Sequence, residues 1–140
     1  MAARICDGPL QTAGLLNHVQ ADSRGASVLF FGTTRSTPGE RAVVALEYEA
    51  HPTMAAMVFE EIEEEVATTW PDTRAYVVHR IGRVATGEAS VVVATAAPHR
   101  KQCYAASQYV MNELKRRAPV WKKEIYEDGS AWKANAPTRA

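Results

Sequence analysis

The sequence predicts an α+β domain in which two main helices pack on a mostly antiparallel sheet. Two observations favour this fold class. Segments with helical periodicity alternate with segments rich in β-branched residues, and no internal repeat, low-complexity tract or linker interrupts them. The chain has 140 residues, a common size for one domain, so residues 1–140 are expected to fold as a single unit.

A short strand at residues 3–6 and a short helix at residues 10–20 are expected to come first. A buried strand follows at residues 25–34, which are rich in β-branched and aromatic side chains. The loop at residues 35–41 contains the Ser, Pro and Gly typical of irregular structure. The next strand, at residues 42–50, is expected to lie antiparallel to the strand before it.

Pro52 opens a helix expected over residues 52–69, because proline is tolerated in a first helical turn. Trp70 and Pro71 are expected to end it. An apolar residue at every fourth position predicts the stripe that faces the core. The residues of this stripe are Met54, Val58, Ile62 and Val66.

Two strands, at residues 74–84 and 88–98, are expected to follow, joined by a glycine-containing turn. A second helix is expected over residues 98–117, since the proline that follows forbids its continuation. Two closing strands are expected within residues 120–127 and 130–135. The core face of the second helix, read from the 3.6-residue period, is Cys103, Ala106, Val110 and Leu114.

The composition is that of an ordinary soluble globular protein, with 46% hydrophobic and 23% charged residues. No apolar run approaches the roughly 20 residues of a membrane-spanning helix. The N-terminal stretch MAARICDGPL has no signal-peptide core, so we expect a cytoplasmic protein. The 16 Lys and Arg balance the 16 Asp and Glu, which argues against a general nucleic-acid binder.

Cys6 and Cys103 lie far apart, without CxxC spacing or paired histidines. Both are interpreted as small core residues, and neither a metal nor a cofactor is predicted. His51 and His79 are weak candidates for a site. His51 adjoins a proline at a helix start, and His79 lies in an apolar strand, where a structural histidine is the simpler interpretation.

The segment LKRRAPVWKKE, residues 114–124, places five cations around an apolar centre. Residues 99–123 contain seven Lys or Arg and one acid, so this region is suited to anions. Lys115 and Lys122 are candidate catalytic groups. A lysine crowded by cations and partly desolvated has a lowered pKa and can serve as a nucleophile or proton donor. A basic helix end that complements the helix dipole explains the same residues.

His99 and Arg100 fall in the first turn of the second predicted helix, where free N–H groups and the helix dipole favour an anion. Side chains that only meet water explain them equally well. Arg35 follows a buried strand, and its guanidinium suits bidentate contact with phosphate or carboxylate. An ordinary loop arginine is the alternative.

Five motifs taken together resemble the large, catalytic subunit of molybdopterin synthase, the MoaE family. They are FFGTTR, LEYEAHPTMA, VVHRIGRVATGE, APHR and MNELKRRAPVWKKE, and the similarity runs in family order over residues 25–133. The resemblance implies an α/β hammerhead-like fold and no cofactor. It also implies a homodimer that joins small ubiquitin-like carrier subunits in a heterotetramer.

The resemblance further implies a sulfurtransferase that converts precursor Z, a cyclic pyranopterin monophosphate, to molybdopterin on the route to the molybdenum cofactor. Two sulfur atoms arrive as a thiocarboxylate on the C-terminal Gly-Gly of the carrier. This chain ends in PTRA, so it matches the acceptor subunit rather than the carrier. The alternative is a binding module whose basic face at residues 99–123 holds RNA or another polyanion.

The family's two pocket lysines fall on Lys115 and Lys122, which the resemblance assigns as general acid or base. Lys115 is expected to be the essential one. Arg35 matches the family's pocket arginine, which implies contact with the substrate phosphate or developing anions.

His99 and Arg100 match a His-Arg pair that binds substrate, and the resemblance implies that they serve the neighbouring subunit's site. Phe30 and Met111 match apolar positions that grip the carrier tail or the pterin. The loop at residues 36–41 departs from the family and is expected to be disordered without ligand. The C-terminus is also short after WKAN, so contacts from a longer extension are not expected.

Overall fold

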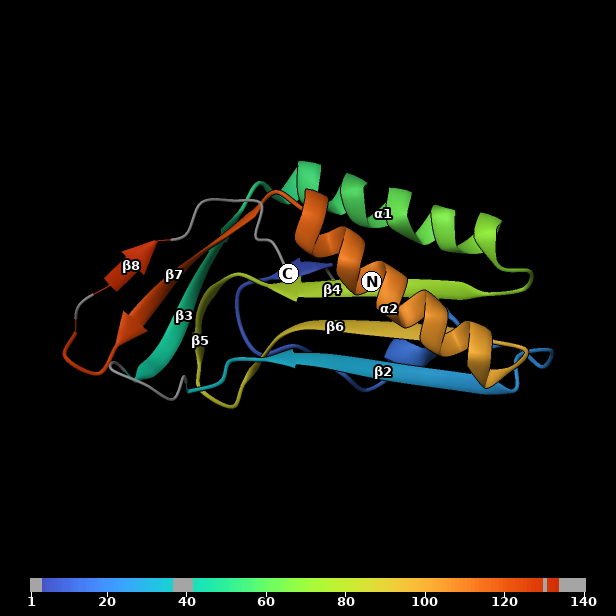
Figure 1. Ribbon diagram of the computed structural model, residues 1–140, viewed down its shortest axis with the longest axis horizontal. Coiled ribbons are helices and arrows are strands. Elements are labelled where there is room, and N and C mark those ends of the chain that lie inside the picture. The colour runs from blue at the N-terminus through green and yellow to red at the C-terminus, as the bar shows by residue number, and fades with distance from the viewer. Residues whose placement is uncertain (1–3, 37–41, 130, 134–140) are drawn as a thin grey trace.

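Two four-stranded sheets and two long helices make up the part of the chain that the computed structural model describes, residues 4–36, 42–129 and 131–133 (Figure 1). In chain order the elements are β1 (Ile5–Cys6), the 3-10 helix η1 (Leu15–His18), β2 (Ala26–Thr33), β3 (Val43–Ala50), α1 (Pro52–Thr69), β4 (Arg74–Arg80), β5 (Gly82–Ala85), β6 (Ala89–Ala97), α2 (Arg100–Arg117), β7 (Val120–Tyr126) and β8 (Ala131–Lys133). None of the helices in these ranges has the length and apolar character needed to cross a membrane.

The first sheet has the strand order β1-β4-β6-β2, with a parallel β1–β4 pair and antiparallel pairs elsewhere. Helices α1 and α2 cover one face, where Phe59, Val93 and Val110 are buried in a common core (Figure 1). On the opposite face a smaller core contains Leu15 of η1 and Val92. This sheet is therefore the middle layer of the fold, and the predicted α+β class is confirmed.

The second sheet has the strand order β5-β3-β7-β8, and all of its pairs are antiparallel. It lies at the end of the molecule where α1 begins and α2 ends (Figure 1). The N–H of His51, just before α1, donates to the carbonyl of Pro119, just after α2. The last turn of α2 is therefore held beside the second sheet.

The bounds predicted for α1 are confirmed at both ends. The His51 side chain caps the helix by accepting from the N–H of Met54 at 3.2 Å, and Trp70 follows the last turn. The predicted core stripe is partly wrong, because Met54 is 52% exposed while Ala55 and Phe59 are buried. A strict four-residue repeat advances about 40° per step around the helix, so the buried stripe must include a three-residue step.

Helix α2 begins at Arg100, two residues later than predicted, because the cap residue His99 still has extended backbone dihedrals. The predicted core face is confirmed. Its residues Cys103, Ala106, Val110 and Leu114 are buried, and Ser107 joins them. The helix ends at Arg117, where Ala118 returns to an extended conformation before Pro119.

Two predictions about the strands are wrong. The strand expected at residues 74–84 is two strands, β4 and β5, which belong to different sheets. The break falls at Ile81, and β5 begins at Gly82, whose φ of 85° favours glycine. The expectation that β3 pairs with β2 also fails, since β2 pairs with β6 and β3 pairs with β5 and β7. Strand pairing is set by distant packing, which local patterns do not record.

The N-terminal predictions hold only in outline. The first strand is reduced to Ile5–Cys6, and the helix expected over residues 10–20 is one 3-10 turn, Leu15–His18. Cys103 is buried as predicted, whereas Cys6 is partly exposed. Burial raises the pKa of the Cys6 thiol, so it remains protonated at neutral pH.

Candidate active site

A pocket of about 440 Å³ lies between the two sheets, beside the last turn of α2. Its walls come from β2, β4 and β6 of the first sheet, from β3 and β7 of the second sheet, and from the C-terminal part of α2. The pocket therefore forms where the helix-covered face of the first sheet extends past the end of α2. In the described part of the chain, no group of three or more His, Cys, Asp or Glu side chains could hold a metal ion.

The wall from the second sheet follows from strand register. Tyr48 on β3 lies opposite Lys122 on β7, and Leu46 lies opposite Glu124. Opposite residues in an antiparallel pair project to the same face, with Cβ atoms about 5 Å apart. These two cross-strand pairs therefore present their side chains together to the pocket.

The wall from the first sheet contains Phe30, Gly32 and Val91. Gly32 lies opposite Val91, and a Cβ placed on Gly32 would come within 2.6 Å of the Val91 Cγ1 atom. Only glycine fits there without a shift of the valine. Phe30, two residues earlier on the same face, is 38% exposed and supplies an aromatic surface.

The wall from α2 contains Met111, Leu114 and Lys115, which lie at helical steps of three and four. Leu114 is also part of the main core, so the core supports this wall from behind. Met111 is packed against the same core. Lys115 therefore approaches the pocket from a helix turn that packing holds in place.

The two pocket lysines affect each other electrostatically. The pKa of Lys122 is lowered mainly by burial and next by the positive charge of Lys115, while Glu124 acts in the opposite direction. Lys122 is therefore deprotonated more readily than an exposed lysine, as the sequence predicts for this segment. Such a group can accept or donate a proton closer to neutral pH.

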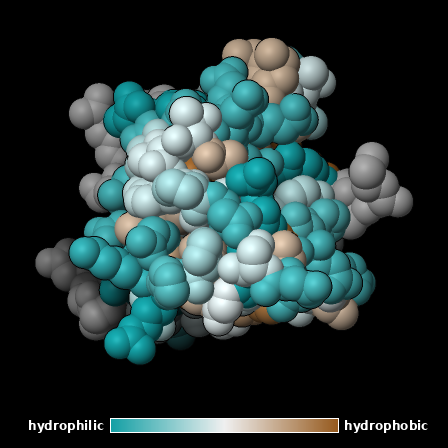
Figure 2. All heavy atoms as spheres, turned by 90° about the vertical axis from the view of Figure 1, so that its right-hand side faces the viewer, coloured by the Kyte–Doolittle hydropathy of each residue, from teal (hydrophilic) through white to brown (hydrophobic). Residues whose placement is uncertain are grey.

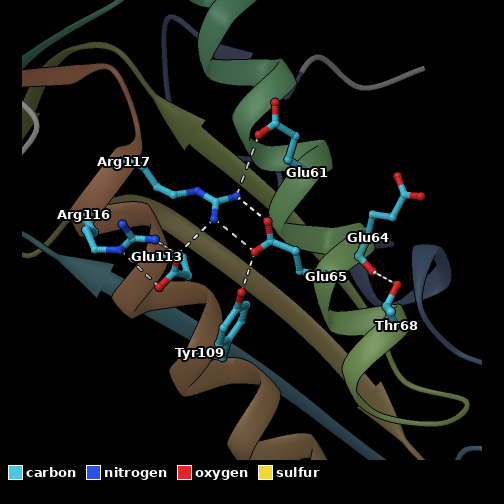
Figure 3. Close-up of polar contacts among 8 residues, drawn as sticks. All are labelled: Glu61, Glu64, Glu65, Thr68, Tyr109, Glu113, Arg116 and Arg117. Carbon is cyan, nitrogen blue, oxygen red and sulfur yellow. Dashed lines mark hydrogen bonds and ion pairs between the residues drawn. The ribbon is translucent and has the colours of Figure 1, made fainter.

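The other three cations of residues 114–124 do not serve the pocket. Arg117 donates two hydrogen bonds to Glu65 on α1, at 3.1 and 2.9 Å, and one to Glu113 at 3.0 Å (Figure 3). Arg116 pairs with Glu113 as well, and its side chain is 67% exposed. Lys123 lies opposite Glu47, on the face of β7 that alternation turns away from Lys122.

Those contacts correct the expectation that the whole basic segment meets anions and that all of its cations lower the lysine pKa. Acids from both helices already pair with the two arginines. The positive charge that the segment offers to the pocket is that of Lys115 and Lys122.

Five of the residues selected from the sequence line the same pocket: Phe30, Arg35, Met111, Lys115 and Lys122. Arg35 follows the end of β2 and is within the described residues. Of the loop expected to be disordered, residues 36–41, only Ser36 is described, so that expectation lies outside the described residues.

His99 and Arg100 are not at this pocket. They lie at the start of α2, and the 15 residues from Arg100 to Lys115 span about 22 Å of helix. The end of the molecule where α2 begins has mainly hydrophilic side chains at its surface (Figure 2). Within a single chain, the structure separates this pair from the pocket lysines.

Five further polar residues line the pocket and are not among the site residues predicted from the sequence, namely Thr33, Tyr48, His79, Ser90 and Glu124. The apolar strand around His79 favours a structural histidine over a site residue. Its ring packs edge-on against Tyr48, with ring centroids 5.1 Å apart. The alternation of side chains along β3 and β7 would identify Tyr48 and Glu124 as pocket residues only if the pairing of those strands were known.

Comparison with known proteins identifies the family of this chain. The family model described as MoaE protein matches residues 5–117. The molybdopterin synthase catalytic subunit of Bacillus subtilis (strain 168) is 40% identical over 128 residues, which cover 91% of this chain and 82% of that protein.

Solved structures agree as well. The crystal structure of molybdopterin synthase from Staphylococcus aureus superposes with a TM-score of 0.90 and 34% identity, covering 94% of this chain and 96% of that chain. The molybdopterin biosynthesis MoaE protein from Burkholderia ambifaria MC40-6 has a TM-score of 0.81 and 33% identity, covering 100% of this chain and 93% of that chain. From its matching sequence and fold, the chain belongs to the MoaE protein family, the family of molybdopterin synthase catalytic subunits.

Proposed function

We propose that this chain is the sulfur-inserting subunit of a molybdopterin synthase, which converts precursor Z to molybdopterin. Each sulfur atom comes from the thiocarboxylate of a small ubiquitin-like carrier subunit whose C-terminus is Gly-Gly. Membership of the MoaE family supports the overall activity. The names of the relatives, which call them catalytic subunits, support a second kind of subunit in the working enzyme.

The observation that carries the proposal is the convergence of Arg35, Lys115 and Lys122 on one pocket. They come from the end of β2, the last turn of α2 and strand β7. The substrate phosphate and the thiocarboxylate tail are both anions, which repel each other in water. Cations in a partly desolvated pocket offset that repulsion more strongly than cations on an open surface.

Proton transfer is assigned to the two lysines. The thiocarboxylate sulfur attacks a side-chain carbon of the pterin, and the carbon–oxygen bond at that carbon breaks, so that the oxygen leaves as water or with the phosphate. Water then cleaves the thioester bond between the carrier and the sulfur, so the sulfur stays on the pterin and the carrier tail leaves as an ordinary carboxylate. Lys122, with its lowered pKa, can accept or donate a proton during these steps. Lys115 keeps that pKa low and is proposed as the essential group for turnover.

The remaining pocket residues are assigned to binding. Arg35 suits the substrate phosphate, because a guanidinium can bind two phosphate oxygens at once. Phe30 and Met111 give the pocket an apolar surface for the carrier tail or the pterin. A Gly-Gly tail has no side chains and can enter a pocket that would exclude an ordinary C-terminus.

His99 and Arg100 are assigned to the pocket of a second copy of this chain. Their distance from Lys115 along α2, about 22 Å, is too long for a shared site within one copy. A homodimer could bring the start of one α2 to the neighbouring pocket. Two carrier subunits would complete a heterotetramer.

A polyanion-binding module is the less favoured function. Such a surface needs several exposed cations that act together. Here Arg116 and Arg117 are paired with carboxylates, and Lys123 lies on the far face of β7. We therefore propose no nucleic-acid partner.

Reconstitution tests the proposal directly. The purified chain is mixed with precursor Z and a thiocarboxylated Gly-Gly carrier, and the pterin product is analysed by mass spectrometry. A pterin that has gained two sulfur atoms is expected. The same carrier with an ordinary carboxylate terminus is the matched control and should give none. Absence of the sulfur-containing pterin with the thiocarboxylated carrier contradicts the proposal.

A further inference from the structure

His79 is a buried histidine in the pocket wall that has no part in the roles assigned above. His79 is 9% exposed and lines the pocket, and its ring packs against the ring of Tyr48. Buried polar groups in proteins are nearly always hydrogen-bonded, so each ring nitrogen must be accounted for.

The hydrogen bonding of the ring fixes its tautomer. Nδ1 lies 2.8 Å from the carbonyl oxygen of Arg80, and since a carbonyl only accepts, Nδ1 carries the proton. Among the described residues, the hydrogen bond of the ring is made by Nδ1. Because His79 lines the pocket, Nε2 is the ring nitrogen left to accept a hydrogen bond from a ligand there.

The imidazole is also uncharged. Burial lowers the pKa of His79 to about 4, and the hydrogen bond to the Arg80 carbonyl opposes that shift only in part. At neutral pH, Nε2 therefore has a lone pair and no proton. A protonated lysine offers no acceptor, so Nε2 supplies an acceptor that the pocket lysines lack while they carry a charge.

The neighbours of His79 form an uncharged wall. Burial raises the pKa of Tyr48, with a hydrogen bond to Ser90 acting in the opposite direction, so the phenol stays protonated at neutral pH. Ser90 in turn donates to the carbonyl of Gly32 at 3.3 Å. Tyr48 lies opposite Lys122 across β3 and β7, so this wall directly adjoins the cationic part of the pocket.

We propose that Nε2 of His79 is a specificity-determining acceptor, which binds a ring N–H of a planar, nitrogen-rich heterocycle whose charged part lies at Lys115 and Lys122. This inference rests on the proposed function, in which the heterocycle is the pterin of precursor Z. A ligand without a matching donor would leave this acceptor desolvated and unpaired, and such sites reject such ligands strongly.

Binding of precursor Z to the purified protein, measured by calorimetry, tests the inference with two matched variants. In His79→Gln the side-chain amide can take the place of Nε2, whereas in His79→Asn it reaches only the place of Nδ1. His79→Asn is expected to weaken binding about tenfold, and His79→Gln at most about threefold. His18→Phe is the control, because His18 stacks on Tyr76, away from the pocket. The affinity of this variant for precursor Z should equal that of the wild type.

Circular dichroism checks that each variant is folded. The affinity of each His79 variant for precursor Z is then compared separately with that of the wild type. Wild-type affinity in His79→Asn overturns the inference, and so does an equal loss in His79→Asn and His79→Gln, which would indicate packing alone. Product formation by the wild type reports on the proposed function separately. If the wild type forms product and His79→Asn binds precursor Z as tightly as the wild type does, only the proposed role of His79 is contradicted.

Discussion

The guanidinium of Arg117 forms two hydrogen bonds with the carboxylate of Glu65, at 3.1 and 2.9 Å, and so joins the last turn of α2 to α1 (Figure 3). Arg117 also donates a hydrogen bond to the carboxylate of Glu113, one turn earlier on α2. Lys115 lies two residues before Arg117. The ion pairs therefore fix the helix turn from which a candidate catalytic lysine reaches the pocket.

Arg117→Ala is expected to lower the free energy of unfolding by about 1 to 2 kcal/mol, because charge-assisted hydrogen bonds between the helices are lost. Arg116→Ala is the matched control. Its exposed ion pair is screened by water and should contribute much less to stability. Urea unfolding measures both variants, and equal losses would show that the contact between helices is not what stabilises this region.

The pKa of Lys122 is expected to rise when Lys115 is replaced by methionine. The positive charge of Lys115 is the second cause of the lowered value, so removing it moves the pKa back towards that of an exposed lysine. Burial, the largest cause, remains, so the return should be incomplete. A titration of the lysine side chains by NMR measures the change, and an unaltered Lys122 would mean that the two lysines do not interact.

Folding stability should fall in acid partly because of His79. The pKa in the folded state is about 4 against 6.5 in the unfolded chain, so between these values the unfolded chain binds the additional proton. The stability that the neutral His79 contributes is complete above pH 6.5 and is lost as the pH falls towards 4. At pH 5 the loss is about 2 kcal/mol relative to pH 7.5.

Urea unfolding at the two pH values checks this prediction. Other groups also titrate in this range, so the useful quantity is the difference between the wild type and His79→Gln. The variant should lose less stability between pH 7.5 and pH 5. Identical pH dependence in the two proteins would mean that His79 is not buried in its neutral form.

Mixed dimers test the assignment of Arg100 to the neighbouring pocket. One copy carries Lys115→Ala and the other carries Arg100→Ala, and each variant is expected to be inactive as a homodimer. If Arg100 acts across the dimer, the mixed dimer contains one complete site and should regain up to about half of the wild-type turnover. If both residues act within one chain, the mixed dimer has no complete site and stays inactive.

Local signals predicted the helices well. Pro52 at the start of α1 and Trp70-Pro71 at its end fix both bounds, and Pro119 limits α2 in the same way. The core stripe of α1 was less accurate, because a four-residue repeat resembles the helical period over two turns but departs from it over four.

The strands could not be predicted as well, because their pairing depends on distant segments. The apolar pattern of residues 74–84 continues through Gly82, although the chain passes there from one sheet to the other. The same limit applies to the site. Lys115 and Lys122 could be selected from their own neighbourhood, whereas the pairing of Arg117 with Glu65 requires knowledge of how α1 meets α2.

The most direct test of the account is the yield of sulfur-containing pterin in a single turnover, compared between Lys115→Ala and Lys123→Ala. Both variants remove one lysine from the basic segment, but only Lys115 lines the pocket. The account predicts that Lys115→Ala binds the carrier and forms almost no product, while Lys123→Ala matches the wild type. Wild-type yield from Lys115→Ala, or equal losses in both variants, would contradict a catalytic pocket at the end of α2.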